Sequence, residues 1–198
     1  MRPAPPPSQR VVRIPPDQIR NQAEELRSLV AGIEGASVEE GIDMPVLHLP
    51  RERLLEGLQI LRDGSLAFRH CSMLTAVDRM PEEPRFEVVY GLYSIEHNRW
   101  VRVKTRCGEF DAVVPSVTGL WPGANWLERE CYDLFGIRFA DHPDLRRILM
   151  PEGYEGFPLR KEFPREGIEP GRLYREWERR RQEPPAAAAG ESAGRYEI

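Results

Sequence analysis

Apolar residues in the first third of the chain recur with helical spacing. Asp17 is predicted to cap a helix, and one apolar stripe follows it in steps of three and four residues: Ile19, Ala23, Leu26, Val30 and Ile33. Gly32 and Gly35 are expected to mark its end. A short strand over 45–49 then leads into a second helix over 50–62, with these positions predicted to face inward: Leu54, Leu55, Leu58 and Leu61.

The middle of the chain alternates apolar and polar residues, which predicts strands. The segment 86–93 puts Phe86, Val88, Tyr90 and Leu92 on one face. After a turn at His97-Asn98, the segment 99–106 is predicted to form the next, antiparallel strand. The segment 66–77 is also favoured as extended chain. These patterns predict an α+β fold in which a small antiparallel or mixed sheet carries helices on one face. The arrangement is ferredoxin-like in shape without a cluster.

Charges and apolar anchors are densest between residues 125 and 164. A turn of helix is predicted over 115–120, and a helix over 126–135 that ends at Gly136. On that helix Arg129 and Asp133 lie four residues apart on one face. The residues after Gly136 show no period of 3.6 or 2, so we expect this part to be ordered by a surface on which it lies.

Four parts are therefore predicted along the chain. Residues 1–16, rich in proline and arginine, are expected to be a disordered arm, and 17–140 the α+β domain. Residues 141–182 are expected to form an extended, partner-binding tail, with a charged helix over 173–182. Residues 183–198 are expected to be a disordered end.

Composition excludes several classes of protein. The 198 residues are 40% hydrophobic, which is enough for one domain with a modest core, and the formal net charge is -4. Nucleic acid usually selects a strongly basic domain, so it is not the expected main partner. No apolar run approaches the roughly 20 residues that span a bilayer, and no signal peptide is expected at the start. The chain is expected to be soluble, or peripheral to a membrane.

Cysteine and histidine do not form a recognisable metal motif. Cys71, Cys107 and Cys131 stand alone, without a Cys-x-x-Cys pair, and the four histidines show no ligand spacing. His70 and Cys71 are adjacent, but neighbours on a strand point to opposite faces and cannot share one ion. The sequence therefore predicts that no metal or redox cofactor binds to this chain.

The carboxylates of the charged stretch admit three interpretations. Glu128, Glu130 and Asp133 would do acid–base work if a pocket desolvated them, but arginines lie within a turn, and neither a nucleophile beside a base nor a phosphate loop is present. A solvated helix face is the simplest alternative. The third interpretation is a partly buried charge network that fixes the helix against the tail and is costly to break from one side.

Several motifs in this stretch together resemble one protein family. They are Glu128-Arg129-Glu130, Tyr132 to Gly136, His142 to Leu149 and Pro158 to Lys161. This pattern resembles the thirty-kilodalton subunit of respiratory complex I, which is the C-type subunit of bacterial NADH:quinone oxidoreductase. Two departures are Glu162, where the family usually has aspartate, and Phe157, where histidine is common.

The resemblance implies a function and partners. Similar proteins are non-catalytic, cofactor-free subunits of the peripheral arm, on the cytoplasmic side of the cell membrane. They bind the large quinone-site subunit (D type) beside the iron–sulfur subunit (B type), in a complex that uses NADH, FMN, iron–sulfur clusters and quinone. Carried onto this sequence, the expected partner-binding residues are Trp126, Glu128, Arg129, Glu130, Asp133, His142, Asp144, Arg146, Arg147, Leu159, Arg160 and Lys161.

Two other functions stay open at this point. The chain would serve equally as the equivalent subunit of a membrane-bound hydrogenase or of a dehydrogenase complex with another electron donor. A free-standing RNA-binding module is suggested only by the run Arg179-Arg180-Arg181 and nearby aromatic residues.

Overall fold

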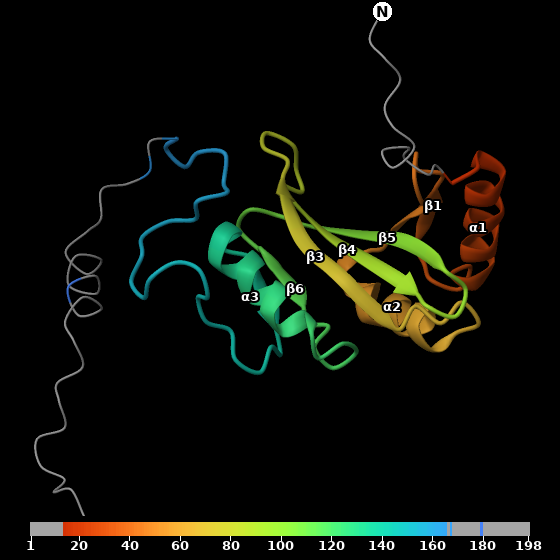
Figure 1. The fold of residues 1–198 in the computed structure, drawn as a ribbon. Helices are drawn as coiled ribbons and strands as arrows, with labels where there is room; N and C mark the ends of the chain where they lie inside the picture. Colours follow the sequence, from red (N-terminus) through yellow and green to blue (C-terminus); the bar gives the residue numbers. More distant parts are fainter. Residues whose placement is uncertain (1–13, 166, 168–178, 180–198) are drawn as a thin grey trace, which may run out of the picture.

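The structure, a computed structural model, describes residues 14–165, 167 and 179. Its centre is a five-stranded sheet in the order β1-β2-β5-β4-β3 (Figure 1). The strands are β1 (Ser37–Glu39), β2 (Val46–His48), β3 (His70–Asp78), β4 (Phe86–Ser94) and β5 (Arg99–Cys107). The β3-β4-β5 meander and the β1-β2 pair are antiparallel, whereas β2 runs parallel to β5. The predicted α+β class with a mixed, mostly antiparallel sheet is confirmed.

The two faces of the sheet differ in character. Register places Val88 of β4 beside Ala76 of β3 and Thr105 of β5, so alternate residues of the three long strands share this face. Its apolar side chains form one continuous core with buried residues of the helices. The opposite face of β5 carries Arg102, Lys104 and Arg106, which are partly exposed. The predicted facing of Val101 and Val103 against these charges is confirmed.

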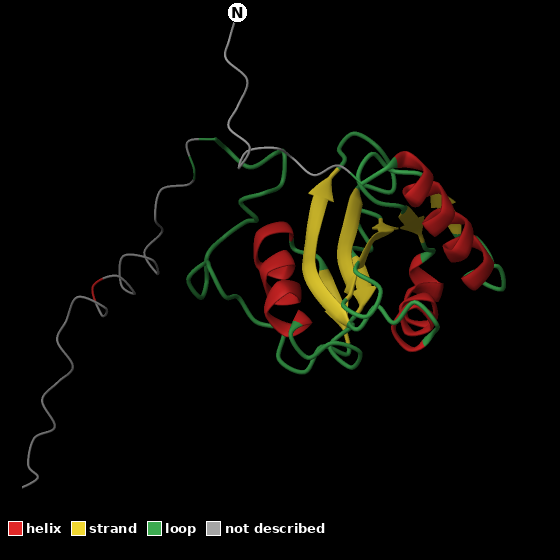
Figure 2. Ribbon diagram, turned by 45° about the vertical axis from the view of Figure 1, so that its right-hand side comes forward, coloured by secondary structure: helices red, strands yellow, loops and turns green. Residues whose placement is uncertain are grey.

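Two helices of the first half lie at the β1–β2 side of the sheet, and a third lies at the β3 side (Figure 2). The first, α1 (Pro16–Leu29), buries the predicted stripe, but it begins one residue before Asp17 and ends before Val30. Asp17 makes no capping hydrogen bond, so that prediction was wrong. Pro15 occupies the N-cap, and its carbonyl accepts the amides of Gln18 and Ile19.

The second predicted helix divides in two. Arg51–Arg53 form a 3-10 turn, and α2 (Leu54–Asp63) follows it. Leu54, Leu58 and Leu61 are fully buried, but Leu55 is 41% exposed, so its predicted inward orientation was wrong. A four-residue leucine cluster is wider than the face that this short helix turns to the core.

The segment that precedes the charged motif also differs from its prediction. The turn predicted over 115–120 begins later than expected: Pro115 ends β6 (Val113–Pro115), and a single turn follows in which Leu120 and Trp121 donate to the carbonyl of Val117. β6 pairs in parallel with β7 (Arg138–Ala140), and α3 (Ala124–Phe135) connects the two strands. The segment 66–77 contains β3, but the strand begins only at His70.

The predicted terminal parts fall largely outside the described residues. These are the arm over 1–16, apart from its last three residues, the charged helix over 173–182, apart from Arg179, and the end over 183–198. Within the described range, none of the helices has the length and apolar character needed to cross a membrane.

Candidate functional site: the charged motif and the C-terminal strap

The charged motif of α3 faces the segment that follows β7. We call residues 141–165 the C-terminal strap; Figure 1 shows it, in cyan to blue, running along the outer side of α3. The helix ends at Gly136, whose φ of 75° is the left-handed conformation predicted for its stop signal. This turn sends the chain through β7 and into the strap, so the motif and the strap come together.

Asp133 is the centre of the contact between α3 and the strap. Its carboxylate is completely buried, and one oxygen, Oδ2, accepts the backbone amides of Ile148, Leu149 and Met150 at 2.7–2.9 Å. The other oxygen accepts Arg147 Nη1 at 2.7 Å. Burial by itself would raise the pKa of Asp133, but these donors outweigh it and lower the pKa below its ordinary value. The carboxylate is therefore held ionised by the strap.

Arg147 extends this contact across the strap itself. Its Nη2 donates to the carbonyls of Tyr154 at 2.8 Å and Gly156 at 3.2 Å, and its guanidinium lies 5.4 Å from the centre of the Phe157 ring. One side chain thus fixes two turns of the strap and pairs with Asp133. Arg147 faces its own domain in this structure.

The side chain of Arg129, one turn before Asp133, also binds backbone carbonyls of the strap. Its Nε and Nη2 donate to the carbonyls of Arg146 and Arg147 at 3.2 and 3.3 Å. Arg129 and Asp133 therefore face the strap together, as their spacing predicted, but they bind different backbone groups. The guanidinium also lies 5.1 Å from the ring centre of Trp126, which is 62% exposed.

Glu128 lies on the other side of α3, in the core. Its carboxylate is fully buried and accepts the Val117 amide at 2.6 Å and the Ser116 hydroxyl at 2.7 Å. Burial raises the pKa of Glu128 to about 7, although these two hydrogen bonds oppose the shift. Glu128 thus ties α3 to the turn that follows β6.

His142, at the start of the strap, completes this buried group. Its Nδ1 accepts the Asp144 amide at 3.0 Å, so the ring hydrogen lies on Nε2. That nitrogen is 3.3 Å from the Asn125 carbonyl and 3.8 Å from Glu128 Oε2. The first residues of the strap are thereby anchored to the N-terminal half of α3.

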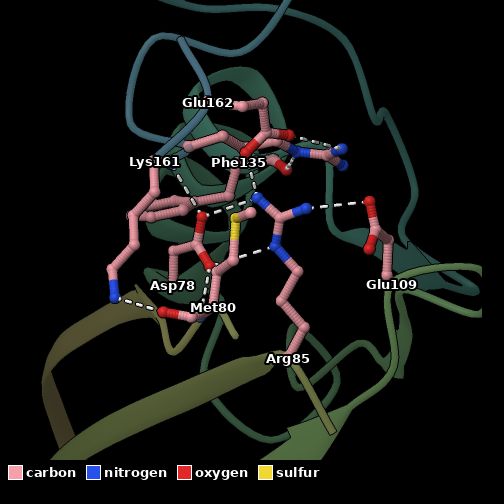
Figure 3. A network of polar contacts seen from close by, with 8 residues as sticks. Asp78, Met80, Arg85, Glu109, Phe135, Lys161 and Glu162 are labelled. Atoms are coloured by element: carbon pink, nitrogen blue, oxygen red, sulfur yellow. Dashed lines mark hydrogen bonds and ion pairs between the residues drawn. The ribbon is translucent and has the colours of Figure 1, made fainter. Parts of the chain in front are cut away.

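A second anchor holds the far end of the strap, and Figure 3 shows its polar contacts. Arg85 at the start of β4 is buried; its Nε and Nη2 bind Asp78 at 3.0 and 2.8 Å, and its Nη1 binds Glu109 at 2.8 Å. Arg85 also pairs with Glu162 of the strap. The Arg85 guanidinium lowers the pKa of Asp78, and Asp78 in turn raises the pKa of Arg85.

Both backbone and side-chain groups of the strap contribute hydrogen bonds to this second anchor. The Lys161 amide donates to Asp78 Oδ2 at 2.8 Å, and Lys161 Nζ donates to the Met80 carbonyl at 2.6 Å (Figure 3). Arg160 Nε donates to the Phe135 carbonyl at 2.6 Å, and its guanidinium lies between the rings of Phe86 and Phe157. Lys161 and Arg160 therefore also contact their own domain.

A small group of side chains on the strap and α3 points outward instead. Leu149 is 57% exposed and Leu159 is 51% exposed, although both lie in the anchored strap. Arg146 is exposed, and among the described residues its one ion pair is with the exposed Asp144, at 2.9 Å. Together with Trp126, these residues form the surface that we call the outer patch: Trp126, Asp144, Arg146, Leu149 and Leu159. Glu130 on α3 is also exposed.

The described residues contain no group of three or more histidine, cysteine or acidic side chains able to hold a metal ion. The three cysteines are unpaired. Burial raises the pKa of the Cys71 and Cys107 thiols to about 11, so both are protonated at neutral pH.

Comparison with known proteins identifies the family to which this chain belongs. A sequence model of the family described as "Respiratory-chain NADH dehydrogenase, 30 Kd subunit" matches residues 47–169, which include β2 from its second residue and the whole strap. The chain belongs to this family. The resemblance inferred from the charged motifs is thus confirmed.

Relatives within the 30-kDa subunit family are similar over most of this chain. The second C-type subunit of the NADH-quinone oxidoreductase of Rhizobium etli is 53% identical over 137 residues, which are 68% of this chain and 71% of the relative. The C-type subunit of the NADH-quinone oxidoreductase of Roseiflexus sp. is 46% identical over 142 residues, 71% of this chain and 81% of the relative.

Solved structures agree on the fold of the family. A trypsin-resistant fragment (1-134) of Nqo5 is 34% identical, with a TM-score of 0.55, and the match covers 65% of this chain and 99% of the fragment. A chain of an archaeal membrane-bound sulfane sulfur reductase has a TM-score of 0.62 over 89% of this chain and 99% of its own length. At 21% identity, this second likeness shows the fold alone.

The structure divides the twelve residues predicted to bind a partner. Glu128, Arg129, Asp133, His142, Arg147, Arg160 and Lys161 contact their own domain or strap, while Trp126, Glu130, Asp144, Arg146 and Leu159 are exposed. Sequence reasoning did not find Asp78, Arg85, Glu109 and Ser116. Of these, Asp78 and Arg85 flank a proline-containing turn, but Arg79, Glu82 and Glu83 lie between them, so the sequence does not single out this pair.

Proposed function

We propose that this chain is a non-catalytic subunit of the peripheral arm of a proton-translocating NADH:quinone oxidoreductase. In this proposal it binds no cofactor and sits on the cytoplasmic side of the membrane. It docks on the large quinone-site subunit next to the iron–sulfur subunit. Family membership and the names of the relatives support the process, and the outer patch supports the mode of docking.

The observation that carries the docking proposal is the exposure of large apolar side chains on an anchored segment. Leu149 and Leu159 are more than half exposed, yet their neighbours in the strap are fixed by Asp133 and Asp78. An exposed tryptophan beside an arginine is typical of the residues that dominate binding at protein interfaces. Displaying such side chains on a fixed backbone reduces the entropy lost on binding.

Most charges of the motif take, in this proposal, the role of the third interpretation of the sequence, a partly buried network that fixes α3 against the strap, and not the partner binding that the resemblance implied. Pairing of Arg147, Arg160 and Lys161 with carboxylates of a partner would first require breaking contacts to Asp133, Phe135 and Met80. We therefore assign these cations to holding the strap. Arg146 is assigned to pairing with a partner, because its carboxylate contact among the described residues, to Asp144, is exposed.

One structural comparison supports an alternative complex in which this chain would serve as a subunit. The fold recurs in a membrane-bound sulfane sulfur reductase, so the same subunit architecture also occurs in a respiratory complex with a different terminal reaction. The alternative proposal is that the chain serves in a related membrane-bound hydrogenase or in a dehydrogenase with another electron donor. The docking mode would be the same in either complex.

The proposal is tested by purifying the tagged native chain in mild detergent, followed by mass spectrometry and an assay of NADH:quinone reduction. The D-type and B-type subunits should co-purify with NADH:quinone activity. Trp126→Ala should weaken this association by about 10- to 30-fold, which is the usual effect of removing an interface anchor worth about 1.4–2 kcal/mol. Arg146→Glu should release the subunit without unfolding it.

Arg20→Glu is the matched control, because Arg20 is as exposed as Arg146 and lies on α1, away from the strap (Figure 1). It should leave association unchanged. Co-purification with hydrogenase or other dehydrogenase subunits would replace the first proposal by the alternative. An intact complex with both Trp126→Ala and Arg146→Glu would contradict the docking mode.

A further inference from the structure

The first residues of the strap are held against α3 by one buried side chain. Asp141, directly after β7, has a φ of 61°, a left-handed conformation that is uncommon outside glycine. The side chain of His142 follows and is fully buried. Further along, the carbonyl of Arg146 accepts Arg129 of α3. We call residues 141–145 the strap base.

His142 holds the strap base in its neutral form. The Asp144 amide donates to Nδ1 at 3.0 Å, so a proton on Nδ1 would set two donors against each other. The hydrogen on Nε2 faces the Asn125 carbonyl at 3.3 Å and lies on the side of Glu128, whose Oε2 is 3.8 Å away. The ring therefore cannot take up a second proton without losing the Asp144 contact.

Glu128 is the carboxyl group that the strap base covers. Its side chain is fully buried, and its two hydrogen-bond donors, the Val117 amide and the Ser116 hydroxyl, are neutral. Among the described residues none of the arginines and lysines pairs with it, and its one ionisable partner is His142. An ionised Glu128 is therefore a buried charge without a cation, which is costly.

The other titratable groups around Glu128 do not supply a positive charge. Burial raises the pKa of each neutral group that faces it, so these stay neutral at pH 7: the Cys71 thiol of β3, the Tyr90 hydroxyl of β4 and the Cys131 thiol of α3. On α3 itself Arg129 binds carbonyls of the strap, and Glu130 is exposed. The strap base adds two exposed carboxylates, those of Asp141 and Asp144.

We propose that Glu128 and His142 form a proton-dependent latch for the strap base. With Glu128 protonated, the base stays closed on α3. Loss of this proton favours an open state in which residues 141–145 turn about Asp141 and water reaches the carboxylate. The contacts of Asp133 with the amides of 148–150 do not involve the latch and are kept in the open state.

The direction of the pH effect follows from the burial of Glu128. Burial raises its pKa from 4.5 to about 7 in the closed state, whereas water restores the ordinary value in the open state. The closed state therefore keeps a proton that the open state loses. The contribution of this proton to closure is fully present below pH 4.5 and is lost as pH rises to 7.

The latch also bears on the outer patch. Asp144 belongs to the strap base and pairs with Arg146, so opening of the base changes the position of this charge pair beside Trp126. Binding of a partner should then weaken as pH rises. This consequence rests on the proposed function, whereas the latch concerns this chain alone and is tested without a partner.

The test is native-state hydrogen exchange of the full-length, isotopically labelled chain, followed by NMR from pH 5.5 to 8 and corrected for the intrinsic pH dependence of exchange. The reporter is the Asp144 amide, which donates to His142. With Glu128 titrating near 4.5 when open and near 7 when closed, the opening equilibrium should increase about 30-fold over this range. It should not change between 0 and about 1 M urea, because a local opening exposes little surface.

Two variants separate Glu128 from its surroundings. Glu128→Gln keeps an acceptor for the Val117 amide but does not titrate, so the pH dependence should disappear. Glu130→Gln is the matched control, because it removes an exposed carboxylate from the same helix and should leave the 30-fold increase in place. Protected amides of the β4–β5 ladder check that each variant is folded.

Several results would overturn the latch. Opening at Asp144 that does not change with pH would show that the strap base opens without releasing Glu128. Opening that increases toward low pH would assign the control to protonation of His142 instead. A urea dependence equal to that of the β4–β5 ladder would show that only global unfolding frees Glu128, and a pH dependence that persists in Glu128→Gln would place the titrating group elsewhere.

Discussion

The substitution Asp133→Asn addresses how the strap is held. It keeps the size of the side chain but removes the charge that three backbone amides and Arg147 share. An asparagine side chain has one oxygen acceptor, and its NH₂ group takes the place of the other carboxylate oxygen. This NH₂ group would face either Arg147 or the strap amides, which are also donors, so those hydrogen bonds are lost. Breaking a buried ion pair from one side costs about 3–5 kcal/mol, because the remaining charge loses its partner.

This cost should appear as local opening of the strap. Amide exchange reports opening free energies residue by residue, and each 1.4 kcal/mol is a factor of about ten. In Asp133→Asn the amides of Ile148, Leu149 and Met150 should therefore exchange about 100-fold to several thousand-fold faster than in the native chain. Amides of the β4–β5 ladder should change far less, since their hydrogen bonds do not involve Asp133.

Asp144→Asn is the matched control, because it removes the same charge from an exposed carboxylate whose pair with Arg146 lies on the surface. It should change exchange of the strap amides by less than about threefold. Equal exchange at 148–150 in Asp133→Asn and the native chain would refute the anchoring role of Asp133, as would equal acceleration by both variants.

Two further predictions concern neighbouring residues. Because the folded pKa of Glu128 is raised from 4.5 to about 7, the folded state keeps a proton that the unfolded chain loses above pH 4.5. The contribution of Glu128 to stability should therefore be fully present below pH 4.5, and about 3 kcal/mol of it should be lost as pH rises to 7. Glu128→Gln, which mimics the protonated form, should flatten this dependence in urea unfolding curves measured from pH 5 to 8, and an unchanged slope would contradict the assignment. Gly136→Ala should destabilise the domain by about 2 kcal/mol, because Gly136 has a φ of 75° and a Cβ there would lie 2.6 Å from the Phe157 ring. Thermal unfolding should show this loss, and Gly119→Ala, with open space around its Cβ, should not share it.

Much of the domain follows from local patterns in the sequence. The stripe from Ile19 to Leu26 and the alternation in β5 each bury one face of a regular element, so periodicity predicts them. The alternation also predicts β4 as a strand, although the structure buries both of its faces. β1, β6 and β7 are three residues long, which is too short for a period to show. The starts of α1 and β3 were also misplaced, since Pro15 and the left-handed Ala67 act through backbone geometry.

The orientation of the charged side chains could be predicted less well. The sequence shows that Arg129, Asp133 and Arg147 are charged groups among apolar anchors, but a partner and the chain's own fold offer the same chemistry. What decides between them is the position of the strap amides 15 to 17 residues beyond Asp133. Such non-local contacts leave no periodic signal, and the same holds for Arg85 and Glu162, which are 77 residues apart.

Hydroxyl-radical footprinting of the chain, alone and in the assembled complex, tests most directly whether the strap is held by its own domain while the outer patch binds a partner. Trp126, Leu149 and Leu159 should be reactive in the free chain and should lose most of their reactivity in the complex, because they belong to the outer patch. Phe157, held between Arg147 and Arg160, should remain protected in both states. An outer patch that stays reactive after assembly would contradict this division of roles, as would a Phe157 that becomes reactive because the strap leaves its own domain.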